Sequence, residues 1–301
     1  METATKVGVL RVSATGTTES GGRTVAGALQ NQKVLRGIYY AFLTVLGLGF
    51  LFPLLWMIGT SLKSGPESLS DATSVIPRHP TLEGYRQAID VLPRYFWNSV
   101  KLAFLNVVGL LVVASLAGYG FARIKFPGRD VLFLVVLGSA LIPGIVYLIP
   151  QYVVFRDFGW VDTHYPLWVP RVMTPVFGTF LMRQFFLGIP KEIEEAARID
   201  GASVFTTFRR VMLPLAKPAL ATVALFTFVD SWNDLLGPLV FLNSPDLQTL
   251  PVALALFQGE FFTNTPGLMA AATLTIIPIF VVFLLAQRYF VQGVVMSGMK
   301  G

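Results

Sequence analysis

The sequence predicts an all-α integral membrane protein, and three observations point to that class. Of its 301 residues, 54% are hydrophobic and only 13% are charged, whereas soluble domains average about a quarter charged residues. The apolar residues come in blocks of about 20, which is the length that a helix needs to cross a bilayer. The polar residues collect between these blocks, which indicates apolar spans joined by polar loops.

Six such blocks predict six transmembrane helices. The fourth block contains Arg171 and Pro175, and a long polar segment separates it from the fifth. The expected spans are residues 37–62, 99–121, 131–150, 165–185, 219–242 and 268–291.

The segments outside the spans have their own signatures. Residues 1–36 are rich in Gly, Ser and Thr, so we expect a flexible tail before a membrane domain of residues 37–301. This tail lacks the apolar region and cleavage site of a signal peptide. Residues 63–96 are interrupted by prolines and should form a loop with a short surface helix near residues 82–91. A tight basic turn is expected at residues 123–129.

The distribution of basic residues predicts the orientation, because cytoplasmic loops carry an excess of Lys and Arg. With the N-terminus inside, 16 of the 23 basic residues fall on the cytoplasmic side and 7 on the outer side. We therefore expect both termini in the cytoplasm, the N-in and C-in arrangement. The basic residues are spread over many short loops, which argues against a nucleic-acid-binding patch.

Residue content excludes several kinds of chemistry. The chain has no cysteine, which rules out disulfides, thiolate metal sites and cysteine nucleophiles. Its two histidines, His79 and His164, leave little room for a metal cluster, and no serine-hydrolase elbow occurs. No Gly-x4-Gly-Lys-Ser/Thr run is present, so the chain has no P-loop for ATP hydrolysis. We expect no catalytic site, no metal and no cofactor bound by this chain.

The most informative polar segment is residues 189–217, on the predicted cytoplasmic side. Pro190 suits the first position of a helix, and the glutamates after it complement the helix dipole. Gly201 fits the left-handed residue that ends a helix. A second short helix should begin at the N-cap Ser203 and stop before Pro214. Two short helices that meet at a glycine would form a compact projection.

On physical grounds this projection is either an ordinary connector or a docking element for a partner. In the first helix, Ile193, Ala196 and Ala197 share one face. An apolar stripe at helical spacing in the second helix favours docking, because a short loop cannot bury it alone. The stripe consists of Phe205, Phe208, Val211 and Met212.

The residue order of this segment resembles the EAA loop of permeases of ATP-binding-cassette (ABC) importers, and we call residues 189–217 the EAA segment. The matching residues are Glu195-Ala196-Ala197, Arg198-Ile199-Asp200-Gly201 and Leu213-Pro214. Flanking residues resemble the sugar-importer branch, most closely the maltose-type second permease: Arg183-Gln184-Phe185-Phe186, Ile189-Pro190, Lys217-Pro218-Ala219-Leu220 and Ser231-Trp232-Asn233-Asp234. The resemblance extends over residues 37–301, including the terminal Gly298-Met299-Lys300-Gly301.

The resemblance implies a multi-pass permease subunit of a bacterial plasma (inner) membrane. In that family the EAA loop forms coupling helices that sit in a cleft of an ATPase subunit, and ATP with Mg is bound by two such ATPases. It also implies a heterodimer with a second permease, an extracytoplasmic solute-binding protein and a carbohydrate cargo, although a polyol or glycerol phosphate stays open. The residues implied to couple to the ATPase, with Glu195 as the principal contact, are Glu195, Ala196, Ala197, Asp200, Gly201, Leu213 and Pro214.

Polar residues in the fifth span form a second candidate site, which consists of Asp230, Trp232, Asn233 and Asp234. The two aspartates and the asparagine lie at i, i+3 and i+4, so they share one helix face. A charge in hydrocarbon is costly, so this face should meet the bundle interior or a water-filled cavity. Either these residues line the translocation path, or they fix helix packing through an aspartate paired with Arg171 or Arg183.

The loop between the fifth and sixth spans, residues 243–266, is a third candidate site. In the maltose-type permease the matching loop reaches into the open binding protein outside the cell. By position, Phe257, Gln258 and Gly259 would lie near its tip. The alternative is an interfacial loop with Phe261 and Phe262 at the lipid headgroups.

A proton-coupled secondary carrier is the alternative function, with Asp230 or Asp234 as the proton site and no ATPase. Against it, the sequence shows no clear inverted repeat and no pair of interrupted spans in matching halves. Six spans are also few for such a carrier, unless it dimerises. The energy source distinguishes the two functions: vanadate-sensitive ATP dependence or sensitivity to a proton uncoupler.

Overall fold

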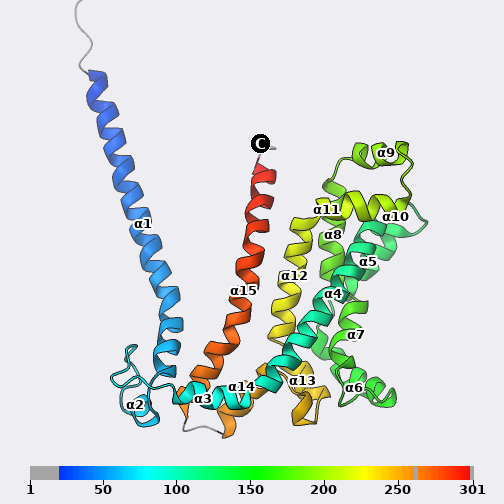
Figure 1. The fold of residues 1–301 in the computed structure, drawn as a ribbon. Coiled ribbons are helices and arrows are strands. Elements are labelled where there is room, and N and C mark those ends of the chain that lie inside the picture. The colour runs from blue at the N-terminus through cyan, green and yellow to red at the C-terminus, as the bar shows by residue number, and fades with distance from the viewer. Residues whose placement is uncertain (1–19, 261–263, 299–301) are drawn as a thin grey trace, which may run out of the picture. The chain divides into compact units, whose positions relative to one another are not determined.

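The computed structural model describes residues 20–260 and 264–298, which form helices joined by turns (Figure 1). No strand occurs in these ranges, so the predicted all-α class is confirmed for the described chain. The chain divides into two compact units, residues 1–55 and 56–301.

The first unit consists of most of one long helix, α1 (Ser20–Ser61). From Leu35 to Leu55 its side chains are exposed except for the half-buried Leu54. The predicted boundary at residue 36 lies inside α1, because residues 20–36 are helical where a flexible tail was expected. Residues 24–36 contain Ala, Leu, Gln, Lys and Arg, which favour helix, so the apolar helix can propagate back through them.

The second unit contains the remaining elements, with α4 at its centre and packed against both α8 and α12. In chain order they are α2 (Gly65–Ser70), α3 (Glu83–Val91), α4 (Pro93–Arg123), α5 (Arg129–Ser139), η1 (Gly144–Tyr147), α6 (Leu148–Asp157), α7 (Tyr165–Met173), α8 (Val176–Gly188), α9 (Lys191–Ile199), α10 (Val204–Thr207), η2 (Phe208–Met212), α11 (Leu213–Leu215), α12 (Lys217–Trp232), α13 (Leu236–Phe241), η3 (Pro245–Leu247), α14 (Leu250–Glu260) and α15 (Thr265–Gly298). The surface helix expected near residues 82–91 is confirmed as α3.

Three helices of the described chain are long and apolar enough to cross a membrane unbroken: Leu35–Ser61, Pro93–Arg123 and Thr265–Tyr289. Three further pairs of helices qualify only as bent spans, with bends of 84°, 76° and 76°. These pairs are Arg129–Ser139 with Gly144–Asp157, Tyr165–Gly188 with Lys191–Ile199, and Val204–Leu215 with Lys217–Trp232. Six spans result if each bent pair counts as one, so that number stays a prediction.

The third, fourth and fifth predicted spans are each interrupted in the structure. α5 ends before Pro143, α7 and α8 are separated at Thr174 and Pro175, and α12 ends at Trp232. Proline lacks an N–H and clashes with the preceding helical turn, which accounts for the first two breaks. Irregular backbone at membrane depth is tolerated where it is buried in protein or lines a cavity. The breaks after α7 and after α12 both line cavities.

The long helices of the second unit form a bundle, and its shorter helices lie at the two opposite ends of that bundle (Figure 1). α9 and the C-terminal end of α15 lie at one end, which we call the α9 end. α3, α6, α13 and α14 lie at the other, the α3 end.

The core near the α9 end is built where α4 and α8 pack together, with η2 and α12 against them. Met182, Phe186 and Met212 are completely buried there. Gly118 of α4 and Gly178 of α8 permit the close approach, since a Cβ on Gly118 would lie 2.6 Å from the Cβ of Met182. These helices therefore form a tightly packed group.

Candidate functional site

The EAA segment has the predicted helix, glycine, helix arrangement. α9 ends at Ile199, and Gly201 has φ +80°, in the left-handed region that a glycine adopts without strain. Ser203 is the N-cap of α10, and its hydroxyl accepts a hydrogen bond from the Thr206 amide at 3.2 Å. The turn is therefore specified by local sequence.

Two details of the segment differ from the expectation. Pro190 is the N-cap of α9 and not its first helical residue. The second helical stretch does not stop at Leu213, but continues through Pro214 to Leu215. Residues Phe208–Met212 form a π-helix that ends two positions before Pro214. A π turn changes the hydrogen-bond register, which relieves the clash that proline causes with an α-helical carbonyl.

The face of α9 that contacts the rest of the chain is the one that carries Glu194. Glu194 is buried, with 6% of its surface exposed, whereas Ile193 and Ala196 are exposed and Ala197 is half-buried. Ile199, at the end of the helix, is 86% exposed. α9 therefore presents an apolar surface that no described residue covers.

The predicted apolar stripe of the second helix is divided between core and surface. Phe208 and Met212 are buried against α4 and α8, Val211 is half-buried, and Phe205 is 62% exposed. The residues implied to couple to an ATPase all lie at the α9 end. Exposed among them are Glu195, Ala196, Asp200, Gly201 and Pro214, while Ala197 and Leu213 are half-buried.

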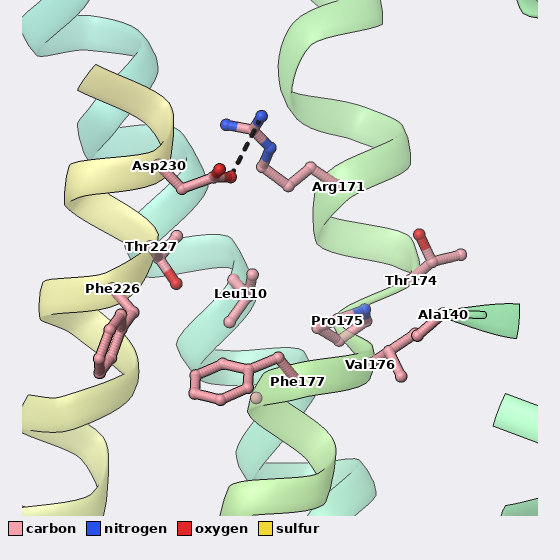
Figure 2. A pocket seen from close by; sticks show the side chains of 11 residues that line it. Leu110, Ala140, Arg171, Thr174, Pro175, Val176, Phe177, Phe226, Thr227 and Asp230 are labelled. Carbon is pink, nitrogen blue, oxygen red and sulfur yellow. Dashed lines mark ion pairs between the residues drawn. The ribbon is translucent and has the colours of Figure 1, made fainter. Parts of the chain in front are cut away.

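A groove between α12 and the α7–α8 break forms the second candidate site. It consists of two adjoining cavities of about 490 and 550 Å³ that share Arg171, Phe226 and Asp230. Figure 2 shows the first cavity, with Asp230 directed at Arg171. The rings of Phe177 and Phe226 lie near each other in another part of the same cavity. These two rings pack edge to face with centroids 5.6 Å apart. The groove is thus apolar along part of its length and charged where the two cavities meet.

Arg171 is the centre of an ion-pair cluster in this groove. Its guanidinium lies 3.3 Å from a carboxylate oxygen of Asp230 and 3.3 Å from one of Asp234. Asp234 also accepts a hydrogen bond from the Gly237 amide at 3.0 Å, near the start of α13. Of the two partners predicted for the aspartates, Arg171 is the one found, because Arg183 lies 3.5 Å from Asp130 instead.

The two aspartates and the asparagine of the fifth span line one cavity, as their shared face predicted, whereas Trp232 points elsewhere. Asn233 and Asp234 lie beyond the last helical residue of α12, and both line the larger cavity. Trp232 is only 1% exposed, stacks on Phe228 and donates a hydrogen bond to the Thr275 carbonyl at 3.1 Å. The expectation that Trp232 lines a path therefore does not fit this conformation, in which it packs against α15.

Three residues that line the groove beside Asp230 were not expected from the sequence. They are Thr174 at the α7–α8 break, Phe177 of α8 and Phe226 of α12. The available signal was Pro175 inside an apolar block, which predicts an interrupted helix. Nothing local indicated which neighbouring helix the break would face.

A third polar cluster lies at the α3 end, around His164. Its Nδ1 is 3.2 Å from the ammonium of Lys101, and its Nε2 is 2.8 Å from the Leu247 carbonyl. Burial lowers the pKa of His164, and the Lys101 charge lowers it further, while the Leu247 carbonyl acts in the opposite sense. Hydrogen bonds from Ser244 and from the amides of residues 243 and 244 lower the pKa of the Asp162 carboxyl nearby.

Acidification is expected to destabilise the protein through His164. Because its pKa is lower in the folded state, the unfolded state binds more protons at a pH below about 6.5, so stability falls as pH falls through that range. Asp162 contributes nothing there, since its stabilisation is lost only below its ordinary pKa of 3.8. Thermal unfolding from pH 7.5 down to about 5 should show a smaller drop in Tm for His164→Asn than for the unaltered protein. An equal drop would contradict this role.

The loop between the fifth and sixth spans is mostly helical, where a plain loop was expected. α14 occupies Leu250–Glu260, so the backbone of Phe257, Gln258 and Gly259 forms its last turn. The side chains of these three residues, and residues 261–263 with Phe261 and Phe262, lie outside the described part of the structure. Their predicted contact with a binding protein stays a prediction.

Comparison with known proteins connects this geometry to a family. A family model described as "Binding-protein-dependent transport system inner membrane component" matches residues 111–296. The chain is 35% identical over 271 residues to the arabinooligosaccharides transport system permease protein AraQ of Halalkalibacterium halodurans, covering 87% of this chain and 97% of that one. It is 34% identical to the trehalose/maltose permease MalG of Thermococcus litoralis (83% and 92% covered) and 34% identical to the trehalose permease SugB of Mycobacterium tuberculosis (88% and 98% covered).

Solved structures share the fold. A chain of a bacterial ABC transporter for import of the acidic polysaccharide alginate superposes with a TM-score of 0.73 at 24% identity, covering 86% of this chain and 98% of that one. A chain of the alginate transporter in complex with a pentasaccharide-bound periplasmic protein gives 0.61 at 14% identity, covering 85% and 94%. At these identities the likeness concerns the fold alone.

Helices long enough to cross a membrane, together with a charged groove between them, fit a component of a membrane transport system. The chain belongs to the family of inner membrane components of binding-protein-dependent transport systems, and is a permease subunit of an ABC importer. It is therefore a transport subunit and not an enzyme. A proton-coupled carrier is not favoured, because transport in this family depends on a binding protein.

Proposed function

We propose that the chain forms, with a second and different permease, the path for uptake of an oligosaccharide or related solute, driven by two separate ATPase subunits. The observation that carries this proposal is the exposed apolar surface of α9 at Ile193, Ala196 and Ile199, beside the exposed Glu195. Exposed apolar patches mark sites of protein–protein contact, and in this proposal the surface of α9 lies in a cleft of an ATPase. ATP and Mg would be bound by the ATPases.

The α9 end is cytoplasmic in this proposal, with both termini inside and six spans, of which the fourth and the fifth flank the EAA segment. The excess of Lys and Arg on that side supports the orientation. The α3 end then faces outward, where the end of α14 at Phe257, Gln258 and Gly259 would meet a solute-binding protein. A bacterial inner membrane is the corresponding location.

The groove at Arg171 would form one wall of the solute path, completed by the second permease. Charged side chains inside a membrane protein are tolerated when they pair and face a cavity, as Arg171 and its two aspartates do. Edge-to-face rings such as Phe177 and Phe226 offer apolar faces to a sugar ring. The names of AraQ, MalG and SugB, which transport oligosaccharides and disaccharides, support a carbohydrate cargo.

Purification of the tagged chain from its native membrane in mild detergent tests the assembly. We expect an ABC ATPase and a second permease to be recovered with it, and uptake of labelled oligosaccharide in proteoliposomes to be ATP-dependent and vanadate-sensitive. Recovery of the chain alone, with uptake that is abolished by a proton uncoupler and needs no ATP, would overturn the proposal.

The groove makes a separate prediction about charge. In Arg171→Gln the two aspartates lose their shared counter-charge, and we expect uptake to fall about tenfold, equivalent to the loss of one charge-assisted hydrogen bond of ~1.4 kcal/mol. Adding Asp230→Asn returns the net charge of the cluster to its original value and should restore part of the uptake. Uptake is expressed per assembled transporter, because Arg171→Gln also breaks the Arg171–Asp234 pair, whose side chains are only 26% and 22% exposed. Equal uptake by both variants and the unaltered protein would exclude a role in the path.

A further inference from the structure

Glu194 is the one charged side chain of α9 that is buried in the described structure. One of its carboxylate oxygens lies 3.6 Å from Nη1 of Arg123, and the two side chains are 8% and 5% exposed. Lys191, Glu192 and Arg198, on the same helix, are all exposed. Charged groups are rarely buried unless they are paired, so this ion pair determines which side of α9 faces the bundle.

The same arginine also holds the end of α8. Its Nη2 donates hydrogen bonds to the carbonyl of Phe186, at 2.5 Å, and to that of Ile189. Both carbonyls belong to the end of α8, where helix carbonyls lack partners within the helix. Arg123 is itself the last residue of α4. One guanidinium therefore joins the ends of α4 and α8 to the carboxylate of α9.

The two helices that Arg123 joins carry the walls of the groove. α4 contributes Leu110, and α8 contributes Phe177 and Gly178 (Figure 2). Between Arg123 and the groove the helices are in tight contact, with Met182 and Phe186 fully buried. Close-packed interiors move as units, so a displacement of the ends of α4 and α8 would reach the groove.

The ion pair also has capacity for a second arrangement. Nε of Arg123 and Oε1 of Glu194 are both buried and form no close hydrogen bond in the described structure, although the Tyr119 hydroxyl lies near the Glu194 carboxylate. A buried donor and acceptor without partners are unfavourable, so both atoms are open to new contacts when α9 changes position. An ion pair whose donors and acceptors all had hydrogen-bond partners would have no atoms free for new contacts.

We propose that Arg123 and Glu194 are positioning residues that transmit movement of α9 to the helices around the groove. The inference rests on the proposed function, because it takes α9 as the element that an ATPase moves. Without the ion pair, α9 would be held by the connections at its two ends and by its contacts with α10 and η2, and it could tilt without displacing α4. With the pair, a shift of α9 pulls on the ends of α4 and α8 together.

The test compares Glu194→Gln, which keeps the shape but removes the charge, with Glu192→Gln on the exposed side of the same helix. Both variants are assembled with their ATPase and second permease and reconstituted in proteoliposomes. We expect Glu194→Gln to hydrolyse ATP at an ordinary rate, while solute taken up per ATP falls roughly five- to tenfold, in the range for residues that couple two sites. Glu192→Gln should keep the ordinary ratio.

Arg123→Lys provides a second variant in case Glu194→Gln assembles poorly. It keeps the positive charge, but a single ammonium lacks the planar fork that serves several acceptors, so uptake per ATP should fall here too. An unchanged ratio in either assembled variant would overturn the proposal.

Failure of the proposed function has a different signature, because the unaltered chain would then recover no ATPase. The effect of the Arg123–Glu194 ion pair on α9 can still be measured in the purified chain by amide hydrogen exchange. Glu194→Gln should raise exchange in residues 191–199 relative to Glu192→Gln. Equal exchange in the two variants would show that the ion pair does not hold α9.

Discussion

Replacement of Gly201 by valine is expected to uncouple ATP hydrolysis from uptake while the protein still inserts and assembles. Gly201 has φ +80°, and nothing lies within 4 Å of where its Cβ would be, so the obstacle is backbone strain and not lack of space. A β-branched residue held in this region costs about 1–3 kcal/mol, which the chain can avoid by opening the turn and tilting α9. Because ~1.4 kcal/mol corresponds to a factor of ten, we expect uptake to fall by about tenfold or more.

Gly201→Asn is the matched control, since asparagine tolerates the left-handed region far better than valine does. It should retain most of the uptake. Glu195→Lys tests the same surface without altering the turn, because Glu195 is exposed and its backbone is ordinary helix. Normal uptake by both Gly201→Val and Glu195→Lys, measured with ATPase activity in proteoliposomes, would remove the EAA segment from the coupling mechanism.

The second large effect is expected for Gly118→Val, which should prevent α4 and α8 from packing. A Cβ at Gly118 would lie 2.6 Å from the Cβ of Met182 and 2.9 Å from the amide nitrogen of Arg183. Backbone cannot move aside as a flexible side chain can, so the helices must separate. Overpacking of this kind costs about 1–3 kcal/mol, and at about 2–4 °C per kcal/mol for a large domain the Tm should fall by about 2–12 °C.

Gly120→Val, two residues further along α4, is its control because no atom lies within 4 Å of its Cβ position. Both variants lose the same glycine flexibility and gain the same side chain. The measurement is the yield of monodisperse protein in detergent, together with its thermal unfolding. A comparable yield and Tm for the two would mean that α4 and α8 do not approach as closely as the structure shows.

Much of the class and of the EAA segment was accessible from the residues alone. Hydropathy blocks indicate membrane helices because the requirement for about 20 apolar residues is local. The turn at Gly201 and the N-cap at Ser203 were predicted for the same reason, since a cap is specified by a few adjacent residues. The motif order then identified the family that the comparisons show.

The groove could be predicted only in part. The cost of an isolated charge implied that Asp230 and Asp234 need a partner or water, and Arg171 was one of two arginines named. The choice between Arg171 and Arg183 depends on how α7, α8 and α12 cross in space. Likewise, a tryptophan beside polar residues does not reveal whether it faces a path or, as Trp232 does, the neighbouring α15.

By itself, the sequence determined what depends on near neighbours along the chain: the membrane class, the helical projection with its glycine turn, the absence of cysteine, and the family. The tertiary structure decided what depends on distant segments. It placed Glu194 and not Ile193 against the bundle, where Arg123 at the end of α4 supplies a buried counter-charge. It also brought the break that Pro175 makes in the fourth span beside Asp230 of α12, so that the groove forms where irregular backbone can face a cavity. Both outcomes follow from packing between helices, which periodicity along one helix does not encode.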